Sequence, residues 1–509
     1  MKKLWLLLIT LALFMLVFTL SNKIDFYQND DWVYYEMVSR FMKGDFTLHP
    51  YTGPTFYTQG LIAAGFARIF SLEKLPILTL LFSVANFYLL SAFILYRMKK
   101  QFSTSVLVGL IYFFNPLNMY LTFGFMTEVY FMFFFLLSLW CILLFDETKN
   151  YKYLALMALV VFAGLNVRQV SLFIPLGLGL FYSYKQNWKP AAVSLITFGA
   201  LYFYYEKIFP LTPRIIEVPL QWKNLLDKDY VAAVFIGTFI VLTAFLLPVF
   251  LSSVNIKEIL SKKKHVLLFL ALAVGLYFLM ISNFNPHEVS WGEFPYFENT
   301  FERTGFYPRG ISGTKYYFKG NYDLYRYWDL VSKILFPIFV SYVIVFKRKA
   351  INLYLVLAVV YTGMLIATKA FYDRYLHILI PTILLFLLKD YFQESKYSKV
   401  ILSGFVLFLM FFSYQLSNDF VLVNKYVWNR SEEISKTEGI EEKYIKGTNA
   451  WKLNYRNVPR DYLYNFSYDS QKVNEEYACC DTLIEEKTIN FPGSIFVDPK
   501  IYLYRLGEY

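Results

Sequence analysis

The chain has 509 residues, of which 57% are hydrophobic, 21% aromatic and only 17% charged. A soluble protein of this length would expose more Lys and Glu and would not carry repeated apolar runs of spanning length, so the composition indicates a polytopic membrane protein. The net charge of +11 is a feature of nucleic-acid-binding proteins, but in this chain the basic residues fall in short connections between apolar runs. We therefore expect membrane lipids as surroundings and no nucleic-acid partner.

The chain begins with Met1-Lys2-Lys3, followed by an apolar run from Leu4 to Leu20. No small-residue cleavage site follows, so the run is predicted to be an uncleaved first anchor rather than a signal peptide. Further apolar runs cover 75–96, 103–121, 125–145, 151–166, 168–184, 190–206, 229–252, 265–282, 329–346, 350–368, 375–392 and 398–416. With the first anchor they predict an all-α membrane region of about thirteen transmembrane helices.

The connections between these runs alternate between two sides of the membrane. One set is short and basic, and holds Arg97/Lys99/Lys100, Lys149/Lys152, Lys185/Lys189, Lys257 with Lys262–Lys264, Lys347–Lys349 and Lys396/Lys399. By the positive-inside rule this set is cytoplasmic, as is the N-terminus. The opposite, extracytoplasmic set holds 21–74, the turns at Thr122–Glu128, Asn166–Arg168 and 369–374, the segments 207–228 and 283–328, and the C-terminus. The protein is thus expected in the cell membrane as a multi-pass protein.

Two segments outside these runs complete the expected architecture. Gly60–Phe70 is interpreted as a helix lying in the membrane interface, because counting it as a span would place the later basic loops outside. The polar tail 417–509 contains short alternating stretches, Ser494–Val497 and Ile501–Tyr504, that favour strands. We therefore expect a membrane domain, 1–416, and a small extracytoplasmic α/β domain, 417–509. Cys141, Cys479 and Cys480 lack metal-ligand spacing and are interpreted as non-catalytic.

The first extracytoplasmic loop carries the acidic pair Asp30-Asp31 soon after the first anchor. Carboxylates are costly in hydrocarbon, so two adjacent ones at a membrane edge face water, a cation or a substrate. From Asp30 to Phe41, apolar and aromatic residues recur at helical spacing, which predicts an amphipathic helix on the membrane surface. The simpler alternative is that one of the two carboxylates caps the N-terminus of this helix.

Several short motifs are similar to those of a known superfamily. They are Asp30-Asp31 with Tyr34, Gly44, His49-Pro50, Thr127-Glu128, Asp373-Arg374-Tyr375-Leu376 and Ile380-Pro381-Thr382. In these motifs the chain resembles the GT-C superfamily of integral-membrane glycosyltransferases, and in particular the family-39-like protein mannosyltransferases and lipid A aminoarabinose transferases. The resemblance implies a GT-C-like membrane domain and transfer of a sugar, with inversion, from a polyprenyl-phosphate donor. The acceptor would be a lipid, a glycan or a protein at the outer face.

The chemistry of such a transfer defines which residues are needed. The donor carries an ionised leaving group, so the reaction needs a carboxylate that takes the acceptor's proton and cations that stabilise the departing phosphate. Asp30 is predicted to be the base, and Asp31 to be a second catalytic residue that orients Asp30, raises its pKa or binds a divalent cation. A metal on an isolated Asp-Asp pair is weakly supported, so no cofactor is assigned and the divalent cation stays an alternative.

The substrate-binding residues are predicted among those on the outer face. Arg168, Lys369 and Arg374 are the candidate phosphate ligands, and Tyr34, His49 and Glu128 complete the set. The simpler interpretation of Arg374 is an interfacial arginine that snorkels to the headgroups and pairs with Asp373. For Arg168 the corresponding alternative is again an interfacial charge, and for Glu128 it is a partner of the helix dipole.

Two further functions fit a protein of this composition. A flippase or transporter of a lipid-linked saccharide would place charged residues along a path at mid-membrane depth and would contain broken helices in paired positions. A polysaccharide polymerase would likewise have many spans and large outer loops. Because the candidate charges cluster on one face, the sequence favours the glycosyltransferase. The aromatic loop 283–328 is expected to contact sugar or the membrane interface.

Overall fold

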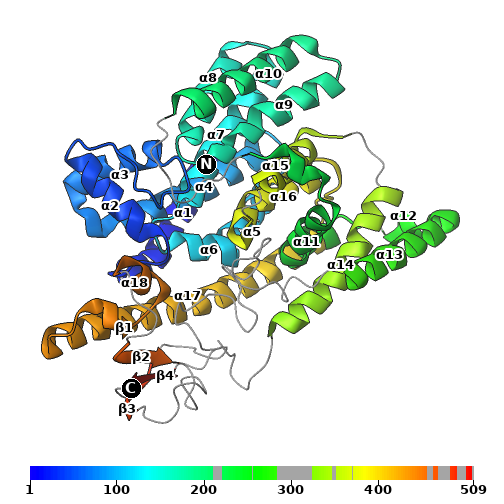
Figure 1. Cartoon of the computed structure of the whole chain (residues 1–509). Helices are drawn as coiled ribbons and strands as arrows, with labels where there is room; N and C mark the ends of the chain where they lie inside the picture. Colours follow the sequence, from blue (N-terminus) through cyan, green and yellow to red (C-terminus); the bar gives the residue numbers. More distant parts are fainter. Residues whose placement is uncertain are drawn as a thin grey trace.

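The computed structural model describes residues 1–209, 220–254, 256–283, 324–346, 351–368, 371–455, 462–467, 482–489 and 500–506. Several sequence predictions lie outside these residues: Lys369, most of the loop 283–328, the stretch 494–497, Cys479 and Cys480. Within the described residues the chain is a bundle of helices with one small sheet at its C-terminal side (Figure 1).

Helices make up most of the described chain. In chain order they are α1 (Lys2–Ser21), α2 (Asp31–Met42), α3 (Tyr57–Phe70), η1 (Leu72–Lys74), α4 (Leu75–Tyr96), α5 (Phe102–Phe113), α6 (Pro116–Thr122), α7 (Thr127–Thr148), α8 (Lys152–Leu165), η2 (Gln169–Leu172), α9 (Phe173–Tyr184), α10 (Trp188–Phe203), η3 (Tyr204–Ile208), η4 (Trp222–Leu226), α11 (Lys228–Leu251), α12 (Ile256–Ser261), α13 (Lys263–Asn283), α14 (Leu324–Phe346), α15 (Leu353–Thr368), η5 (Asp373–Ile378), α16 (Leu379–Asp390), α17 (Lys396–Glu438), η6 (Glu442–Tyr444) and α18 (Asn449–Asn454). Each apolar run predicted from the sequence is a helix or a pair of consecutive helices at similar bounds, except that the run 398–416 is the first part of the longer helix α17. The predicted helical region is confirmed, and its apolar helices fit a membrane protein.

The described helices differ in how well they suit a membrane crossing. Five of them are long and apolar enough to cross, and two bent pairs, each counted as one span, raise that number to seven. Four shorter apolar helices lie at 152–165, 169–184, 330–346 and 353–368. The pair α5–α6 bends by 63° where Asn115 caps α6 through Leu117 N–H and Pro116 occupies the first turn. The figure of thirteen spans stays a prediction.

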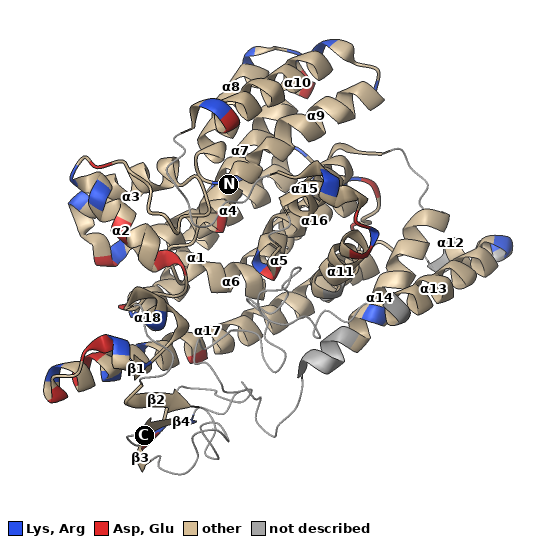
Figure 2. Ribbon diagram, in the orientation of Figure 1, with Lys and Arg blue, Asp and Glu red and all other residues tan. Residues whose placement is uncertain are grey.

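Several of the connections that were predicted to be cytoplasmic contact one another. Arg97 forms an ion pair with Glu147 at 2.5 Å. Three hydrogen bonds add to it: Tyr182 Oη donates to Asp146 at 2.7 Å, Gln101 N–H to Glu394 at 2.7 Å and Asn352 Nδ2 to Asp390 at 2.5 Å. These contacts link residues up to 293 positions apart in the chain. Figure 2 shows Lys and Arg around the connections of α8, α9 and α10. Several of the basic connections therefore lie at one end of the bundle.

The connections of the opposite set also contact one another, at the end that carries α2 and α3. Thr58 N–H donates to Asn166 O at 2.9 Å, and Gln59 Nε2 donates to Phe125 O at 3.4 Å. The predicted amphipathic helix is α2, with Tyr34, Met37, Val38 and Phe41 among its buried residues. The segment predicted as an interfacial helix is α3, which packs against α2 and exposes Leu61, Ile69 and Phe70. Some connections of this set thus contact one another, and the assignment of the two sets to opposite sides of a membrane stays a prediction.

The longest helix, α17, has 43 residues and continues through the predicted domain boundary at 416/417. Beyond that point Val423, Val427 and Ile434 pack against a four-stranded sheet of order β1-β2-β4-β3. The strands are β1 (Ile445–Lys446), β2 (Tyr464–Ser467), β3 (Thr482–Thr488) and β4 (Lys500–Arg505), with β1 parallel to β2 and the other pairs antiparallel. The strand expected at 501–504 is confirmed as β4. The small sheet exists, and the helix that supports it is continuous with the membrane region.

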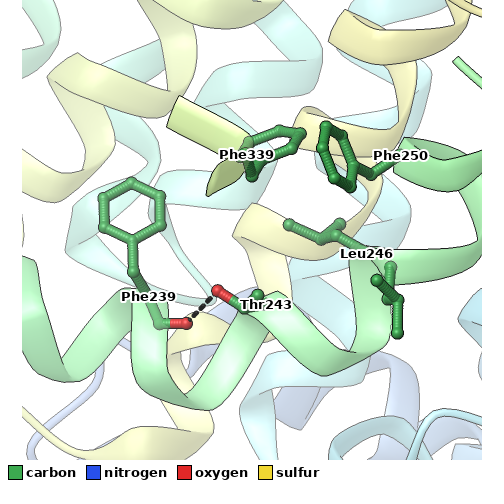
Figure 3. Close-up of a pocket in the computed structure, with 6 residues that line it drawn as sticks. Phe239, Thr243, Leu246, Phe250 and Phe339 are labelled. Carbon is green, nitrogen blue, oxygen red and sulfur yellow. Dashed lines mark hydrogen bonds between the residues drawn. The ribbon is translucent and has the colours of Figure 1, made fainter. Parts of the chain in front are cut away.

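Apolar space lies between α11 and its neighbours. The helix α11 bends by 70° between Thr243 and Phe245, and near the bend a small pocket is lined by α11 residues and by Phe339 of α14 (Figure 3). A second cavity of about 370 Å³ is lined by α11, α14, α15 and α16, with Phe239, Thr362, Ile366 and Leu379 among its walls. This larger cavity lies within the apolar part of the bundle.

Candidate active site

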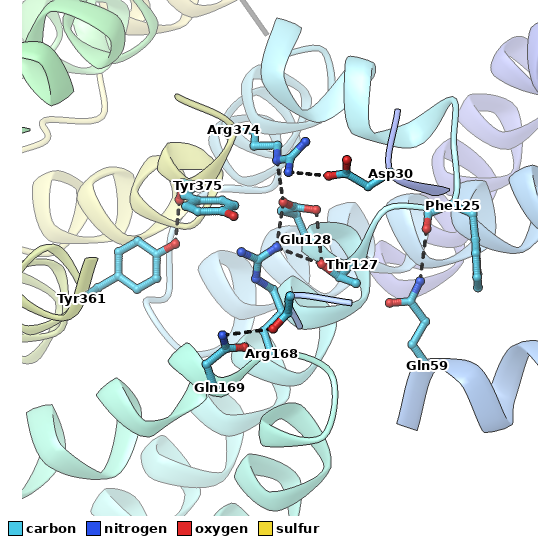
Figure 4. A network of polar contacts seen from close by, with 11 residues as sticks. Asp30, Gln59, Phe125, Thr127, Glu128, Arg168, Gln169, Tyr361, Arg374 and Tyr375 are labelled. Carbon is cyan, nitrogen blue, oxygen red and sulfur yellow. Dashed lines mark hydrogen bonds and ion pairs between the residues drawn. The ribbon is translucent and has the colours of Figure 1, made fainter. Parts of the chain in front are cut away.

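Four charged side chains from distant parts of the sequence form one network (Figure 4). Arg374 Nη2 lies 2.9 Å from Asp30 Oδ2, and Arg374 Nε lies 3.3 Å from Glu128 Oε1. Arg168 Nη1 lies 2.7 Å from the same Glu128 oxygen. The charges therefore alternate from Asp30 through Arg374 and Glu128 to Arg168. All four were predicted from the sequence as site residues.

The members of the network differ in their contact with solvent. The side chains of Glu128 and Arg374 are 3% and 7% exposed, and that of Arg168 is 14% exposed. The side chain of Asp30 is 40% exposed. A buried charge needs an opposite partner, and each buried member has one. Asp30 is the open end of the network, where a carboxylate oxygen can meet an incoming molecule.

Asp30 occupies the N-cap position of α2, but its side chain makes no capping hydrogen bond. It is directed at Arg374 instead (Figure 4). The interpretation of Asp30 as a simple helix cap is therefore wrong. Its backbone position is set by the start of α2, and its side chain belongs to the ion network.

Asp31 has a different environment from its neighbour. It is 1% exposed, and it accepts hydrogen bonds from Asn29 N–H at 2.9 Å and from Phe125 N–H at 3.4 Å. Burial raises the pKa of Asp31 to about 6, the backbone amides oppose this rise, and the charge of Asp30 adds to it. Among the described residues no group of three His, Cys, Asp or Glu side chains could hold a metal ion.

Arg168 is fixed on two sides. Its Nη1 donates to Thr127 Oγ1 at 2.8 Å, and its guanidinium lies 4.4 Å from the ring centroid of Tyr375. Tyr361 Oη in turn donates to the carbonyl of Tyr375 at 2.6 Å. Thr127, Tyr361 and Tyr375 were not predicted as site residues. Thr127 and Tyr375 adjoin predicted residues in the chain, whereas nothing in the sequence singles out Tyr361 among 44 tyrosines.

Arg374 lies on the short 3₁₀-helix η5 and is paired across the bundle, so it is not a snorkelling interfacial arginine as the alternative supposed. Side chains three residues apart on a 3₁₀-helix eclipse one another, which places His377 behind Arg374. His377 Nε2 lies 3.0 Å from both Asn118 Oδ1 and Tyr112 Oη. Among the described residues, Nη1 of Arg374 is buried without a hydrogen-bond partner.

Tyr34, a further predicted site residue, lies near the network. Tyr34 is buried and stacks on Phe56 at 5.0 Å between ring centroids. Burial raises the pKa of Tyr34, and the charges of Asp30 and Glu128 raise it further, so a neutral hydroxyl lies within electrostatic reach of the network.

His49 packs against Trp32, at 5.6 Å between ring centroids, and its Nε2 lies 3.7 Å from Glu36. These contacts place His49 beside the first turns of α2. Lys369 lies outside the described residues.

No family model matches the chain, and no curated protein or solved structure is significantly similar to it. The site is thus defined by its geometry alone. It combines a half-exposed carboxylate, which can take a proton, with two guanidinium groups, which suit the geometry of phosphate oxygens.

Proposed function

We propose that this chain is a membrane glycosyltransferase of the GT-C type that moves a sugar from a polyprenyl-phosphate donor to a lipid, glycan or protein acceptor. The proposal rests above all on the exposed Asp30 carboxylate, held 2.9 Å from the guanidinium of Arg374. A general base and a phosphate ligand therefore lie side by side. A displacement at the anomeric carbon needs both groups next to the reacting sugar, and a phosphate bound by Arg374 would free Asp30 to take the acceptor's proton.

Each residue of the network has its own role in the proposed reaction. The acceptor hydroxyl gives its proton to Asp30 as its oxygen bonds to the anomeric carbon. The bond between that carbon and the phosphate oxygen breaks at the same time, so the sugar is transferred with inversion. Arg374 binds the phosphate, on which negative charge grows during departure. Glu128 holds Arg374 in place and is itself held by Arg168.

The charge of the network bears on the choice of donor. Arg168 and Arg374 balance Asp30 and Glu128, so the four charges of the network cancel. A polyprenyl-phosphate sugar is a phosphodiester, so it adds a single negative charge to this neutral site. A diphosphate would bring a second negative charge into a largely buried site, at the cost of its desolvation.

The larger apolar cavity supports a lipid-linked donor. Tyr361, which contacts the backbone of Tyr375, directly precedes Thr362 in the cavity wall. Leu379, also in the wall, begins α16 directly after η5, the helix that carries Arg374. The cavity of about 370 Å³ is therefore walled in part by α15 and α16, the helices on either side of the connection that carries Arg374, and its walls suit an isoprenoid chain.

The finer topology belongs to the same proposal. The basic connections at one end would be cytoplasmic, and the end with α2, α3 and the sheet extracytoplasmic, in a multi-pass protein of the cell membrane with about thirteen spans. The reaction then takes place at the outer face.

One observation favours the carrier as a second candidate. The pair α5–α6 is bent by 63° and α11 by 70°, and broken helices are typical of transporters. Against it, the charged network lies among the connections at one end of the bundle and not along a path through its middle.

The test uses the full chain reconstituted in lipid vesicles with polyprenyl-phosphate mannose, glucose or galactose and a membrane extract as acceptor. We expect sugar transfer with release of polyprenyl phosphate, and a fall of at least roughly 10²-fold in the Asp30→Asn variant. The control is Glu36→Gln, further along α2, which should keep full activity. Transfer at the wild-type rate in Asp30→Asn would contradict the assignment of the base. Movement of the lipid-linked sugar across the vesicle without transfer would favour the carrier.

A further inference from the structure

The carboxylate of Asp31 connects two segments that lie far apart in the chain. Its Oδ1 accepts from Asn29 N–H at 2.9 Å and its Oδ2 from Phe125 N–H at 3.4 Å, across 94 positions of sequence. Both carboxylate oxygens of Asp31 thus accept hydrogen bonds from backbone amides. Asp31 is also only 1% exposed, so its carboxylate is turned away from solvent. A side chain in this position cannot meet a substrate.

A second contact joins the same two segments. Gln28 Nε2 donates to Tyr120 O at 2.7 Å. At Gly124 the chain leaves room for the Gln28 side chain, since a Cβ atom there would lie 1.9 Å from Gln28 Oε1. The segment 28–31 therefore docks on the turn 120–125, and the contact leaves no space for a residue larger than glycine at position 124.

The docked segments carry two members of the ion network. Asp30 lies between the two docking residues Asn29 and Asp31, and Glu128 follows Phe125 by three residues. Arg374 bridges the carboxylates of Asp30 and Glu128 at 2.9 and 3.3 Å. The distance between these carboxylates is thus set by the docking of one segment on the other.

We propose that Asp31 is a positioning residue that fixes the Asp30 carboxylate relative to Glu128 and Arg374 by holding the amides of Asn29 and Phe125. Asp31 acts through the backbone and touches neither donor nor acceptor. The kinetic part of this inference rests on the proposed function, and the structural part does not.

The structural experiment is hydrogen–deuterium exchange at neutral pH on the purified full chain in detergent, read on peptides that contain Asn29 and Phe125. In Asp31→Ala both amides lose their acceptor, so we expect both peptides to exchange about tenfold faster or more, and together. Asp31→Asn keeps one acceptor oxygen and should give an intermediate result. Asp30→Asn is the matched control and should leave both peptides unchanged. Faster exchange at Asn29 alone, or at neither site, overturns the inference.

Gly124→Ala tests the same docking from the opposite segment without altering Asp31. Its new methyl group displaces Gln28, so it should produce the same paired loss of protection. This variant serves if Asp31→Ala does not yield folded protein, as judged by its elution in size-exclusion chromatography. Wild-type exchange in Gly124→Ala at both peptides would overturn the docking that the inference requires.

The kinetic experiment measures transfer by the Asp31 variants. A misplaced base lowers kcat by about 10- to 100-fold while KM for the donor stays within about twofold. Wild-type kcat in Asp31→Ala overturns the inference, as does complete loss combined with unchanged exchange, which would make Asp31 catalytic. Paired loss of protection in the Asp31 variants of a chain whose wild type transfers no sugar would refute the proposed function and leave the positioning role standing.

Discussion

The adjacent carboxylates Asp30 and Asp31 lie in different environments at the start of α2. The side chain of Asp30 is 40% exposed and faces an arginine, whereas Asp31 is 1% exposed and faces backbone amides. Successive residues at a helix start point about 100° apart, so a pair of identical residues reaches two different environments. The sequence identifies the pair, and only the distant turn at Phe125 decides which member is buried.

The raised pKa of Asp31 predicts a pH dependence of stability. Burial raises its pKa to about 6 from an ordinary 3.8, so the folded chain binds this proton more tightly than the unfolded chain does. The contribution of Asp31 to the free energy of unfolding therefore rises by up to about 3 kcal/mol as pH falls from about 6 to about 4. Its ionisable neighbours are Asp30, Tyr27, Tyr35 and Tyr120.

Thermal unfolding in detergent at pH 7.5 and pH 5 would measure this effect. Asp31→Asn should show a smaller gain in stability at pH 5 than the wild-type chain. If stability changed equally between pH 7.5 and pH 5 in the two proteins, this result would contradict a raised pKa of Asp31.

The buried Glu128 predicts a large loss of stability on mutation. Glu128→Gln removes the one carboxylate that separates Arg168 from Arg374, which leaves two buried cations facing each other. We expect a loss of about 3 kcal/mol or more. Glu147→Gln is the matched control, because Glu147 pairs with Arg97 but is 50% exposed, and its loss should stay below about 1 kcal/mol. Chemical unfolding of both variants gives the comparison, and similar losses would count against the buried network.

At the scale of elements, the site depends on how closely α2 and α3 approach. Gly60 of α3 lies against Phe41 of α2 and against Phe56, and a Cβ atom at Gly60 would come within 2.5 Å of the Phe41 ring. The glycine therefore sets the spacing of the two helices at the end of the bundle that carries Asp30. Sequence patterns placed both helices correctly, but the contact between them depends on side chains that no periodicity reveals.

Gly60→Ala tests this spacing. The new methyl group must displace one of two buried rings, so we expect a loss of about 1–3 kcal/mol in stability and reduced sugar transfer. Gly65→Ala lies on the same helix with nothing within 4 Å of its Cβ position, and should be neutral or slightly stabilising. If both variants behave alike in thermal unfolding, the close approach of α2 and α3 is not what holds this end together.

At the scale of the whole molecule, the alternating basic and long connections predict which loops share a side, and several loops assigned to one side contact one another. Such a prediction is feasible because charge and hydropathy act over whole segments and need no detailed packing. The same reasoning placed Asp30, Glu128, Arg168 and Arg374 on one face, where the structure joins them. It missed Tyr361 and Tyr375, and also the extension of α17, because these depend on packing between distant segments. Val423, Val427 and Ile434 on α17 follow a helical spacing within a polar stretch.

The proposed orientation of the molecule predicts a labelling pattern. In a chain without its native cysteines, Lys43→Cys at the α2 end and Lys189→Cys at the basic end are both exposed positions. A maleimide that cannot cross membranes should label only Lys43→Cys in intact cells, and both positions after lysis. Labelling of Lys189→Cys in intact cells would show that the topology is the reverse of the proposed one.

Under the proposed function, the unbroken α17 has a consequence for how an acceptor is delivered. A continuous helix offers no hinge between the membrane bundle and the sheet that rests on it. The part of α17 beyond Leu416 is 22 residues long, or about 33 Å, and the sheet packs along it from Val423 to Ile434. An acceptor that contacts the sheet would therefore be held at a fixed position relative to the bundle. We expect a proline or a short insertion near Asn424 to uncouple acceptor choice from the chemistry, leaving small soluble acceptors as good substrates and large ones as poor substrates.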